Sequence, residues 1–112
     1  MKIVALLLFL TAPCFAAEFN RAALVGVRLE LADEKRVAIY TFTDAGDAIA
    51  TIGIKDGPLA GPVFQWKIEK GKLCIFDDTW MSIYTLEEEK TDRILVHDDK
   101  GAKLVFYRTK KE

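Results

Sequence analysis

The chain is poor in the side chains that nucleophilic and metal-assisted enzymes use. Its 112 residues contain one histidine, His97, and one serine, Ser82. Covalent catalysis needs a nucleophile held beside a base, and a metal centre needs several converging ligands. This composition predicts that the protein is not an enzyme and has no catalytic residues, no metal site and no cofactor.

The chain also lacks an excess of charge of one sign. Lysine and arginine total 16 against 17 aspartate and glutamate residues, and no basic cluster interrupts this balance. A nucleic-acid-binding protein carries a positive footprint, so we expect no nucleic acid partner. A hydrophobic share of 51% with 29% charged residues is too apolar for a disordered segment and too charged for a membrane bundle, which indicates a globular domain.

The first residues have the pattern of a secretion signal. Lys2 precedes an apolar run over residues 3–10, and small residues follow up to Ala16. We therefore expect residues 1–16 to be a cleaved signal peptide and residues 17–112 to be one secreted or periplasmic domain. The apolar run is well short of the roughly 20 residues that cross a bilayer as a helix, so no transmembrane segment should remain after cleavage. Lipid attachment at Cys14 is the alternative.

Cleavage would leave Cys74 as a single cysteine, which excludes an internal disulfide. We expect Cys74 to be a buried small hydrophobic residue. An intermolecular disulfide and a reactive thiol are the alternatives.

The remainder of the chain predicts an all-β domain. Segments rich in β-branched and aromatic residues alternate with Gly- and Asp-containing turns every eight to twelve residues or so, which is typical of short antiparallel strands. The expected strands are Leu24–Leu31, Val37–Phe42, Ala48–Ile54, Val63–Ile68, Lys72–Phe76, Trp80–Glu87, Asp92–His97 and Ala102–Thr109. Because the connections are short, we expect an antiparallel up-and-down meander of about eight strands that closes into a small barrel.

Alternation along the last five strands assigns their side chains to two faces. The expected inner face comprises Phe64, Trp66, Ile68, Leu73, Ile75, Met81, Ile83, Ile94, Val96, Val105 and Tyr107. The expected outer face is also apolar in its second half, with Cys74, Phe76, Trp80, Tyr84, Leu86, Leu95, Leu104 and Phe106. An exposed apolar patch indicates an interaction surface. A register slip at a bulge, or coverage by the N-terminal segment 19–24, is the alternative.

Four segments carry a resemblance to a known family. Leu24-Val25-Gly26 opens the first strand, Tyr40-Thr41-Phe42-Thr43 enters a turn, Phe64-Gln65-Trp66-Lys67-Ile68 precedes a Gly turn, and Phe106-Tyr107-Arg108 ends the last strand. Together they resemble the small secreted bacterial lipocalin-like domains, which implies a barrel that binds a small apolar molecule. In that family a Gly-x-Trp motif plugs the closed end beneath a basic residue, to which Arg108 corresponds. Here Val27 and Arg28 follow Gly26, so the Trp is missing.

One set of residues raises the question of catalysis. The expected register places Ser82 opposite His97 on the outer face, with Asp99 across from Trp80. The serine lies in mid-strand, without the sharp turn and the backbone donors that an acyl-transfer site requires. The arrangement therefore does not change the prediction of a protein without catalytic activity.

Two functions remain. The first is a carrier that holds a small apolar ligand inside the barrel, with cavity residues Phe64, Trp66, Met81, Ile83, Tyr107 and, from a lid, Leu59. The second is a protein-binding module or inhibitor that acts on another envelope protein, or forms a homodimer, through an outer patch of Trp80, Tyr84, Arg93, Phe106 and Arg108. A continuous cavity in the barrel favours the first function, and a filled interior favours the second.

Overall fold

A computed structural model of the protein describes residues 17–110; the expected signal peptide and Cys14 lie outside this range. A single turn of helix, α2 (Arg21–Leu24), precedes nine strands. In chain order the strands are β1 (Val27–Leu31), β2 (Arg36–Phe42), β3 (Asp47–Ile54), β4 (Leu59–Ala60), β5 (Val63–Glu69), β6 (Lys72–Phe76), β7 (Met81–Glu89), β8 (Arg93–His97) and β9 (Lys103–Lys110). Within residues 17–110 no helix has both the length and the apolar character needed to cross a membrane.

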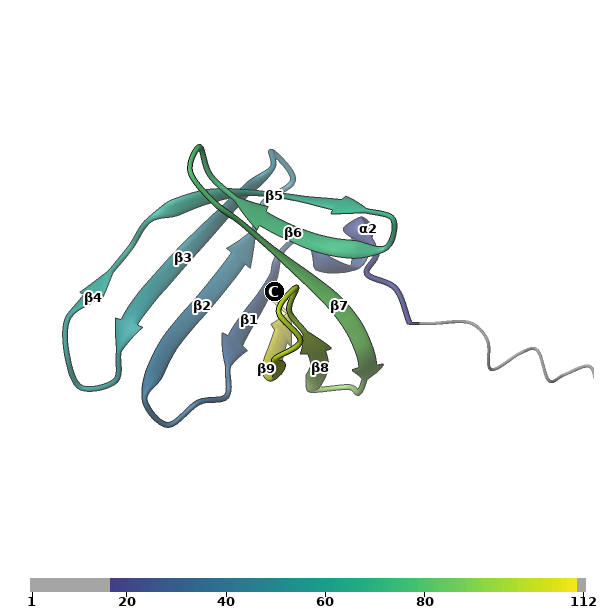
Figure 1. The fold of residues 1–112 in the computed structure, drawn as a ribbon. Helices are drawn as coiled ribbons and strands as arrows, with labels where there is room; N and C mark the ends of the chain where they lie inside the picture. The colour runs from purple at the N-terminus through teal and green to yellow at the C-terminus, as the bar shows by residue number, and fades with distance from the viewer. Residues whose placement is uncertain (1–16, 111–112) are drawn as a thin grey trace, which may run out of the picture.

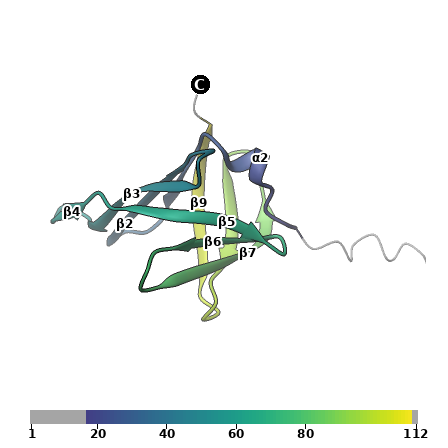
Figure 2. The ribbon, with the colours of Figure 1, turned by 90° about the horizontal axis from the view of Figure 1, so that it is seen from above.

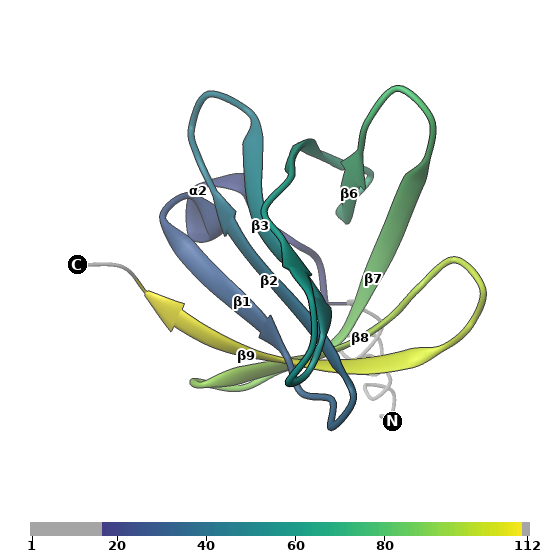
Figure 3. The ribbon, with the colours of Figure 1, turned by 90° about the vertical axis from the view of Figure 1, so that its left-hand side faces the viewer.

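The strands form a closed antiparallel barrel, as the sequence predicts. Apart from β4, each strand pairs with the next one along the chain, so that β3 pairs with β5, and β1 pairs with β9. The short β4 adds to the end of β3. Eight strands thus close the barrel, and β4 is an extra strand. In Figure 1 the strands wrap around one interior, and Figure 2 shows β5 and β6 running across β8 and β9. In Figure 3, β1 to β3 form one wall and β7 part of the opposite wall.

The barrel has two distinct ends because successive turns alternate between them. The β2–β3, β5–β6 and β7–β8 turns lie at one end of the barrel, which we call the closed end. Figure 1 shows α2 beside the β5–β6 turn, and Arg21 of α2 donates a hydrogen bond to the Asp44 carbonyl in the β2–β3 turn. The Phe19 amide donates a hydrogen bond of 2.9 Å to the Gly71 carbonyl in the β5–β6 turn, and the Phe19 side chain is only 8% exposed. The other end, with the β1–β2, β3–β5, β6–β7 and β8–β9 connections, is the open end.

The predicted register of β5 and β6 is confirmed. Trp66 lies opposite Ile75, and Ile68 lies opposite Leu73. Phe64, Trp66, Leu73 and Ile75 are buried, as are Ile94 and Val96 on β8, and Ile68 packs against them. The buried core of these strands is therefore the inner face that alternation predicts.

The predicted faces of β7 are wrong because the preceding turn is one residue longer than expected. The Asp77 carboxylate accepts hydrogen bonds from the Thr79 and Trp80 amides, and the Asp77 amide donates to the Trp80 carbonyl. This four-residue turn pairs Phe76 with Met81. A shift of one residue moves every side chain of a strand to the other face. Tyr84 and Leu86 are consequently buried, Ile83 faces outward and Met81 is 45% exposed.

The same error occurs at the β8–β9 turn, where another aspartate accommodates an extra residue. The Asp98 carboxylate accepts hydrogen bonds from the Lys100 and Ala102 amides, so His97 pairs with Lys103. Phe106 is therefore buried with Leu104 beside the core, whereas Tyr107 is 49% exposed on the outer face with Val105.

The predicted outer patch is not a continuous apolar surface. Tyr84, Leu86 and Phe106 belong to the core, and Leu104 packs against it. A β-bulge between Leu86 and Glu88 then restores the predicted orientation of β8. The predicted patch thus results from a predicted register of β7 and β9 that is wrong by one residue.

Candidate functional site

The middle of the barrel is filled by side chains. The inward residues leave no space for even one water molecule among Phe19, Leu29, Tyr40, Leu73, Ile75, Tyr84, Ile94, Val96 and Phe106. Aromatic contacts account for much of this packing: the Tyr84 and Phe106 ring centroids are 5.9 Å apart, and those of Tyr40 and Phe106 are 6.4 Å apart. A ligand inside this part of the barrel would have to displace the core.

A pocket of about 160 Å³ lies above this core at the open end, and we call it the mouth pocket. Its walls come from β1, β2, β3, β7 and β9, and most of them are apolar. The lining residues are Leu31, Arg36, Val37, Ala38, Tyr40, Ile52, Gly53, Tyr84, Leu104 and Phe106. An apolar hollow with a few converging polar groups is the usual form of a small-molecule site.

The β1–β2 turn places Arg36 at the lip of the mouth pocket. One Asp33 carboxylate oxygen accepts hydrogen bonds from the Lys35 amide at 2.7 Å and the Arg36 amide at 3.1 Å. These backbone hydrogen bonds hold the pKa of Asp33 below its ordinary value, so the carboxylate stays charged. Its second oxygen meets the Arg36 Nε at 3.4 Å, which is a long contact on an exposed side chain.

Close packing beside the pocket requires glycine at position 53. A Cβ atom there would lie 2.2 Å from the Pro58 carbonyl oxygen, because β4 folds directly over the end of β3. Gly53 therefore fixes the β3–β4 hairpin against one wall of the mouth pocket.

Two buried phenols form the polar part of the pocket wall. Tyr40 is 6% exposed and Tyr84 is 9% exposed, and they lie on opposite sides of the barrel. Burial raises the pKa of Tyr40, and the neighbouring Tyr84 phenol raises it further. Burial also raises the pKa of Tyr84, to which the Asp98 carboxylate contributes. Both hydroxyl groups therefore remain protonated at neutral pH and can donate hydrogen bonds, to each other as well as to a ligand.

The buried phenols predict a loss of stability in alkali. Because Tyr40 and Tyr84 bind their protons more tightly in the folded than in the unfolded protein, their contribution to stability is complete below about pH 10, the ordinary tyrosine pKa. Above that pH the free energy of unfolding should fall by up to about 1.4 kcal/mol per pH unit for each phenol. Urea unfolding between pH 8 and 11 measures this slope. Tyr40→Phe should reduce it and Tyr107→Phe should not; equal slopes in the two variants would contradict the assignment.

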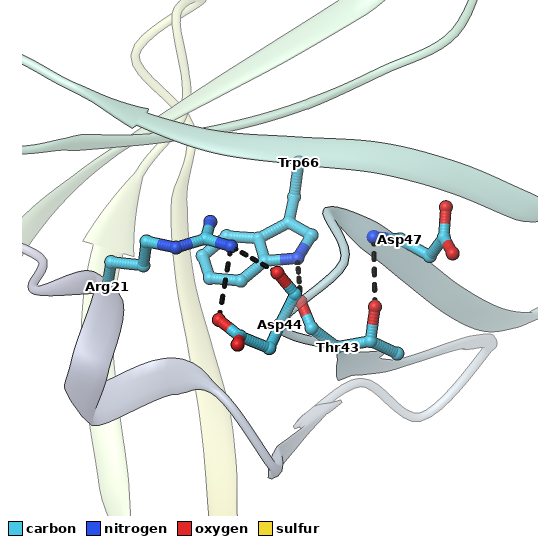
Figure 4. Close-up of polar contacts among 5 residues, drawn as sticks. All are labelled: Arg21, Thr43, Asp44, Asp47 and Trp66. Carbon is cyan, nitrogen blue, oxygen red and sulfur yellow. Dashed lines mark hydrogen bonds and ion pairs between the residues drawn. The ribbon is translucent and has the colours of Figure 1, made fainter.

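The closed end has a different arrangement, which Figure 4 shows. The Trp66 Nε1 donates a hydrogen bond of 2.9 Å to the Thr43 carbonyl, and the Arg21 guanidinium lies 4.7 Å from the Trp66 ring centroid. Arg21 also donates to the Asp44 carbonyl at 2.6 Å. A tryptophan beneath a cation thus closes this end, but it comes from β5 and the cation comes from α2.

Arg108 lies at the closed end as well, and it ties β9 to the β7–β8 turn. Its guanidinium donates to the Glu89 carboxylate and to the Lys90 carbonyl. The side chain points inward opposite Leu29 and is 21% exposed. Arg108 therefore holds the barrel together and does not contribute to an outer patch.

The structure distributes the predicted site residues over the whole barrel. Of the expected cavity residues, Phe64 and Trp66 are buried, Ile83 faces outward, and Met81, Tyr107 and Leu59 are 45%, 49% and 56% exposed. None of the six lines the mouth pocket. Of the expected outer patch, Tyr84 and Phe106 line the mouth pocket from inside. Trp80 is 38% exposed and packs edge-on against Phe64 at 4.9 Å, and Arg93 is exposed on β8.

The predicted proximity of Ser82 and His97 is wrong. The bulge and the longer turn place Thr85, rather than Ser82, opposite His97. The His97 Nδ1 contacts the Glu87 carboxylate, which also meets the Lys103 ammonium at 3.6 Å. These are surface contacts between neighbouring strands.

Cys74 is buried, as the sequence predicts. It lies on the outer side of β6 opposite Lys67 and Ile83, yet it is only 3% exposed. Desolvation raises the pKa of its thiol, which disfavours the reactive thiolate.

Two polar residues of the mouth pocket, Arg36 and Tyr40, are not among the residues that the sequence predicts for a site. Arg36 and Tyr40 lie on one strand, four positions apart, and alternation places both side chains on the inner side of β2. The spacing of Arg36 and Tyr40 can be read from the sequence. The residues that complete the pocket with them, such as Ile52, Tyr84 and Leu104, come from three other strands and cannot be grouped without the strand pairing.

Comparison of the chain with protein-family models, with characterised proteins and with solved structures finds no match.

Proposed function

We propose that the protein is a secreted or periplasmic, non-catalytic binding protein that holds a small apolar ligand at the open end of a lipocalin-like barrel. The observation that carries this proposal is the mouth pocket of about 160 Å³ above a filled core. A dry engineered cavity of about 150 Å³ with apolar walls binds benzene. The expected occupant therefore has the size of one six-membered ring or a short alkyl chain.

The proposed ligand site lies at the mouth of the barrel rather than in its interior. The filled core supports a shallow site, and the residues Ile52 and Leu104 provide apolar contacts on facing walls. The expected affinity is modest, because a ligand of this size has few atoms with which to offset the entropy that it loses on binding.

A titration with toluene tests the proposal. Toluene should shift the amide resonances of Ala38, Ile52 and Leu104 in isotope-labelled protein, with saturation. Ala38→Leu puts three additional carbon atoms at the pocket wall and should weaken toluene binding at least about 10-fold, because a filled cavity has no space for the ring. Ala22→Leu makes the same change on the exposed helix α2 at the closed end and should leave binding unchanged.

Two results would contradict the proposal. The first is the absence of saturable shifts, and the second is equal binding by the two leucine variants. Sedimentation of the same samples would show whether the protein forms a dimer instead.

A protein-binding module is the second candidate, and exposed apolar side chains favour it. Ile54 and Leu59 on the β3–β4 hairpin are 61% and 56% exposed. Trp80, the last residue of the β6–β7 turn, and Met81, the first of β7, are also exposed. A separate hollow of about 270 Å³ on the outer face contains Arg93 among its lining residues. Self-association or capture of an envelope protein without toluene binding would favour this candidate.

A further inference from the structure

The mouth pocket combines an apolar hollow with a single cationic side chain. Among residues 17–110, Arg36 is the only charged residue that lines it. A guanidinium carries five N–H donors in a planar fork that matches a carboxylate. In the described contacts, the Arg36 side chain uses its Nε on Asp33 at 3.4 Å. The terminal nitrogens therefore remain available to a ligand.

The two phenols complete a set of donors beside Arg36. Tyr40 and Tyr84 are buried and line the same pocket as Arg36. Hydroxyl and guanidinium donors bind an anionic oxygen more strongly than a neutral one, because the hydrogen bonds are charge-assisted. A neutral hydrocarbon would leave these donors without a ligand partner.

We infer that the ligand of the mouth pocket is a small monocarboxylate, whose apolar body lies against Ile52 and Leu104 and whose carboxylate binds Arg36 together with the phenol hydroxyls of Tyr40 and Tyr84. This inference rests on the proposed function, because it specifies the ligand class of the same site. The pocket volume of about 160 Å³ limits the apolar body to about the size of one ring.

A comparison of benzoate with toluene tests the inference. The two molecules have the same ring, and benzoate adds the carboxylate. Benzoate should bind the wild-type protein at least about 10-fold more tightly than toluene, and the advantage should decrease as salt screens the exposed Arg36. Binding is measured by the same amide resonance shifts.

Arg36→Gln should abolish the preference for benzoate over toluene, because it removes the charge but keeps most of the side chain. Arg36→Lys should retain part of the preference, since it keeps the charge without the fork. Lys55→Gln removes another exposed cation from the open end outside the pocket and should change neither ligand's binding. Thermal melting of each variant verifies that it is folded.

The outcomes separate this inference from the proposed function. Equal binding of benzoate and toluene, unaffected by Arg36→Gln, would overturn the carboxylate assignment and leave the binding function intact. Absence of binding by both molecules would overturn both. An equal loss of benzoate binding in Lys55→Gln and Arg36→Gln would show general charge attraction and would also overturn the assignment.

Discussion

Trp66→Ala should lower the free energy of unfolding by roughly 3 to 5 kcal/mol, the range for truncating a large buried aromatic residue. Trp66 is only 3% exposed and packs against Phe42 with ring centroids 5.1 Å apart. The substitution also removes the Nε1 hydrogen bond to the Thr43 carbonyl and the contact with Arg21. A small domain has a total stability of only about 5 to 15 kcal/mol, so the variant should be largely unfolded at moderate urea concentrations.

Trp66→Phe separates the ring from its polar contact. It keeps most of the buried surface and removes the Nε1 donor, while the Thr43 carbonyl still accepts from the Gly46 amide at 3.2 Å, so it should cost less than the alanine variant, about 1 to 2 kcal/mol. Urea unfolding, monitored by circular dichroism, measures both variants. If Trp66→Ala unfolds at a urea concentration close to that of the wild type, the closed end is not held by this tryptophan.

The type of turn between two strands determines whether their register can be predicted from the sequence. Between β5 and β6 the Lys70-Gly71 turn has both residues at positive φ, which fixes a tight two-residue hairpin and hence the register. The sequence therefore predicts correctly that Trp66 lies opposite Ile75. Where a turn begins with an aspartate that caps two amides, as at Asp77 and Asp98, one additional residue fits into the loop.

Composition does not reveal that extra residue. Tyr84 and Phe106 are large hydrophobic residues, and so are their outward-facing neighbours Ile83 and Tyr107, so either face of β7 and β9 satisfies a pattern of alternation. Only the pairing with Leu73 and Ile94 determines which set lies inside. The mouth pocket depends on that pairing, because Tyr84 and Phe106 form part of its wall.

The sharpest test of the C-terminal register compares two adjacent aromatic residues on β9. Phe106 is 4% exposed and Tyr107 is 49% exposed, although they are next to each other in the chain. Phe106→Ala should cost roughly 3 to 5 kcal/mol of unfolding free energy, because it removes contacts with the Tyr40 and Tyr84 rings and leaves a cavity. Tyr107→Ala should cost about 1 kcal/mol or less, since its ring is already half in water.

The two variants are matched in position and in the size of the deletion, so their difference in urea midpoint reports burial alone. A larger loss of unfolding free energy in Tyr107→Ala than in Phe106→Ala would indicate the shorter β8–β9 turn, with Phe106 on the outer face. Phe106 would then not line the mouth pocket, and toluene binding should be insensitive to Phe106→Ala. If Phe106 is buried, Phe106→Leu keeps an apolar side chain in the core and should recover most of the stability that Phe106→Ala loses. It should still alter the pocket wall, so stability and toluene binding should respond separately.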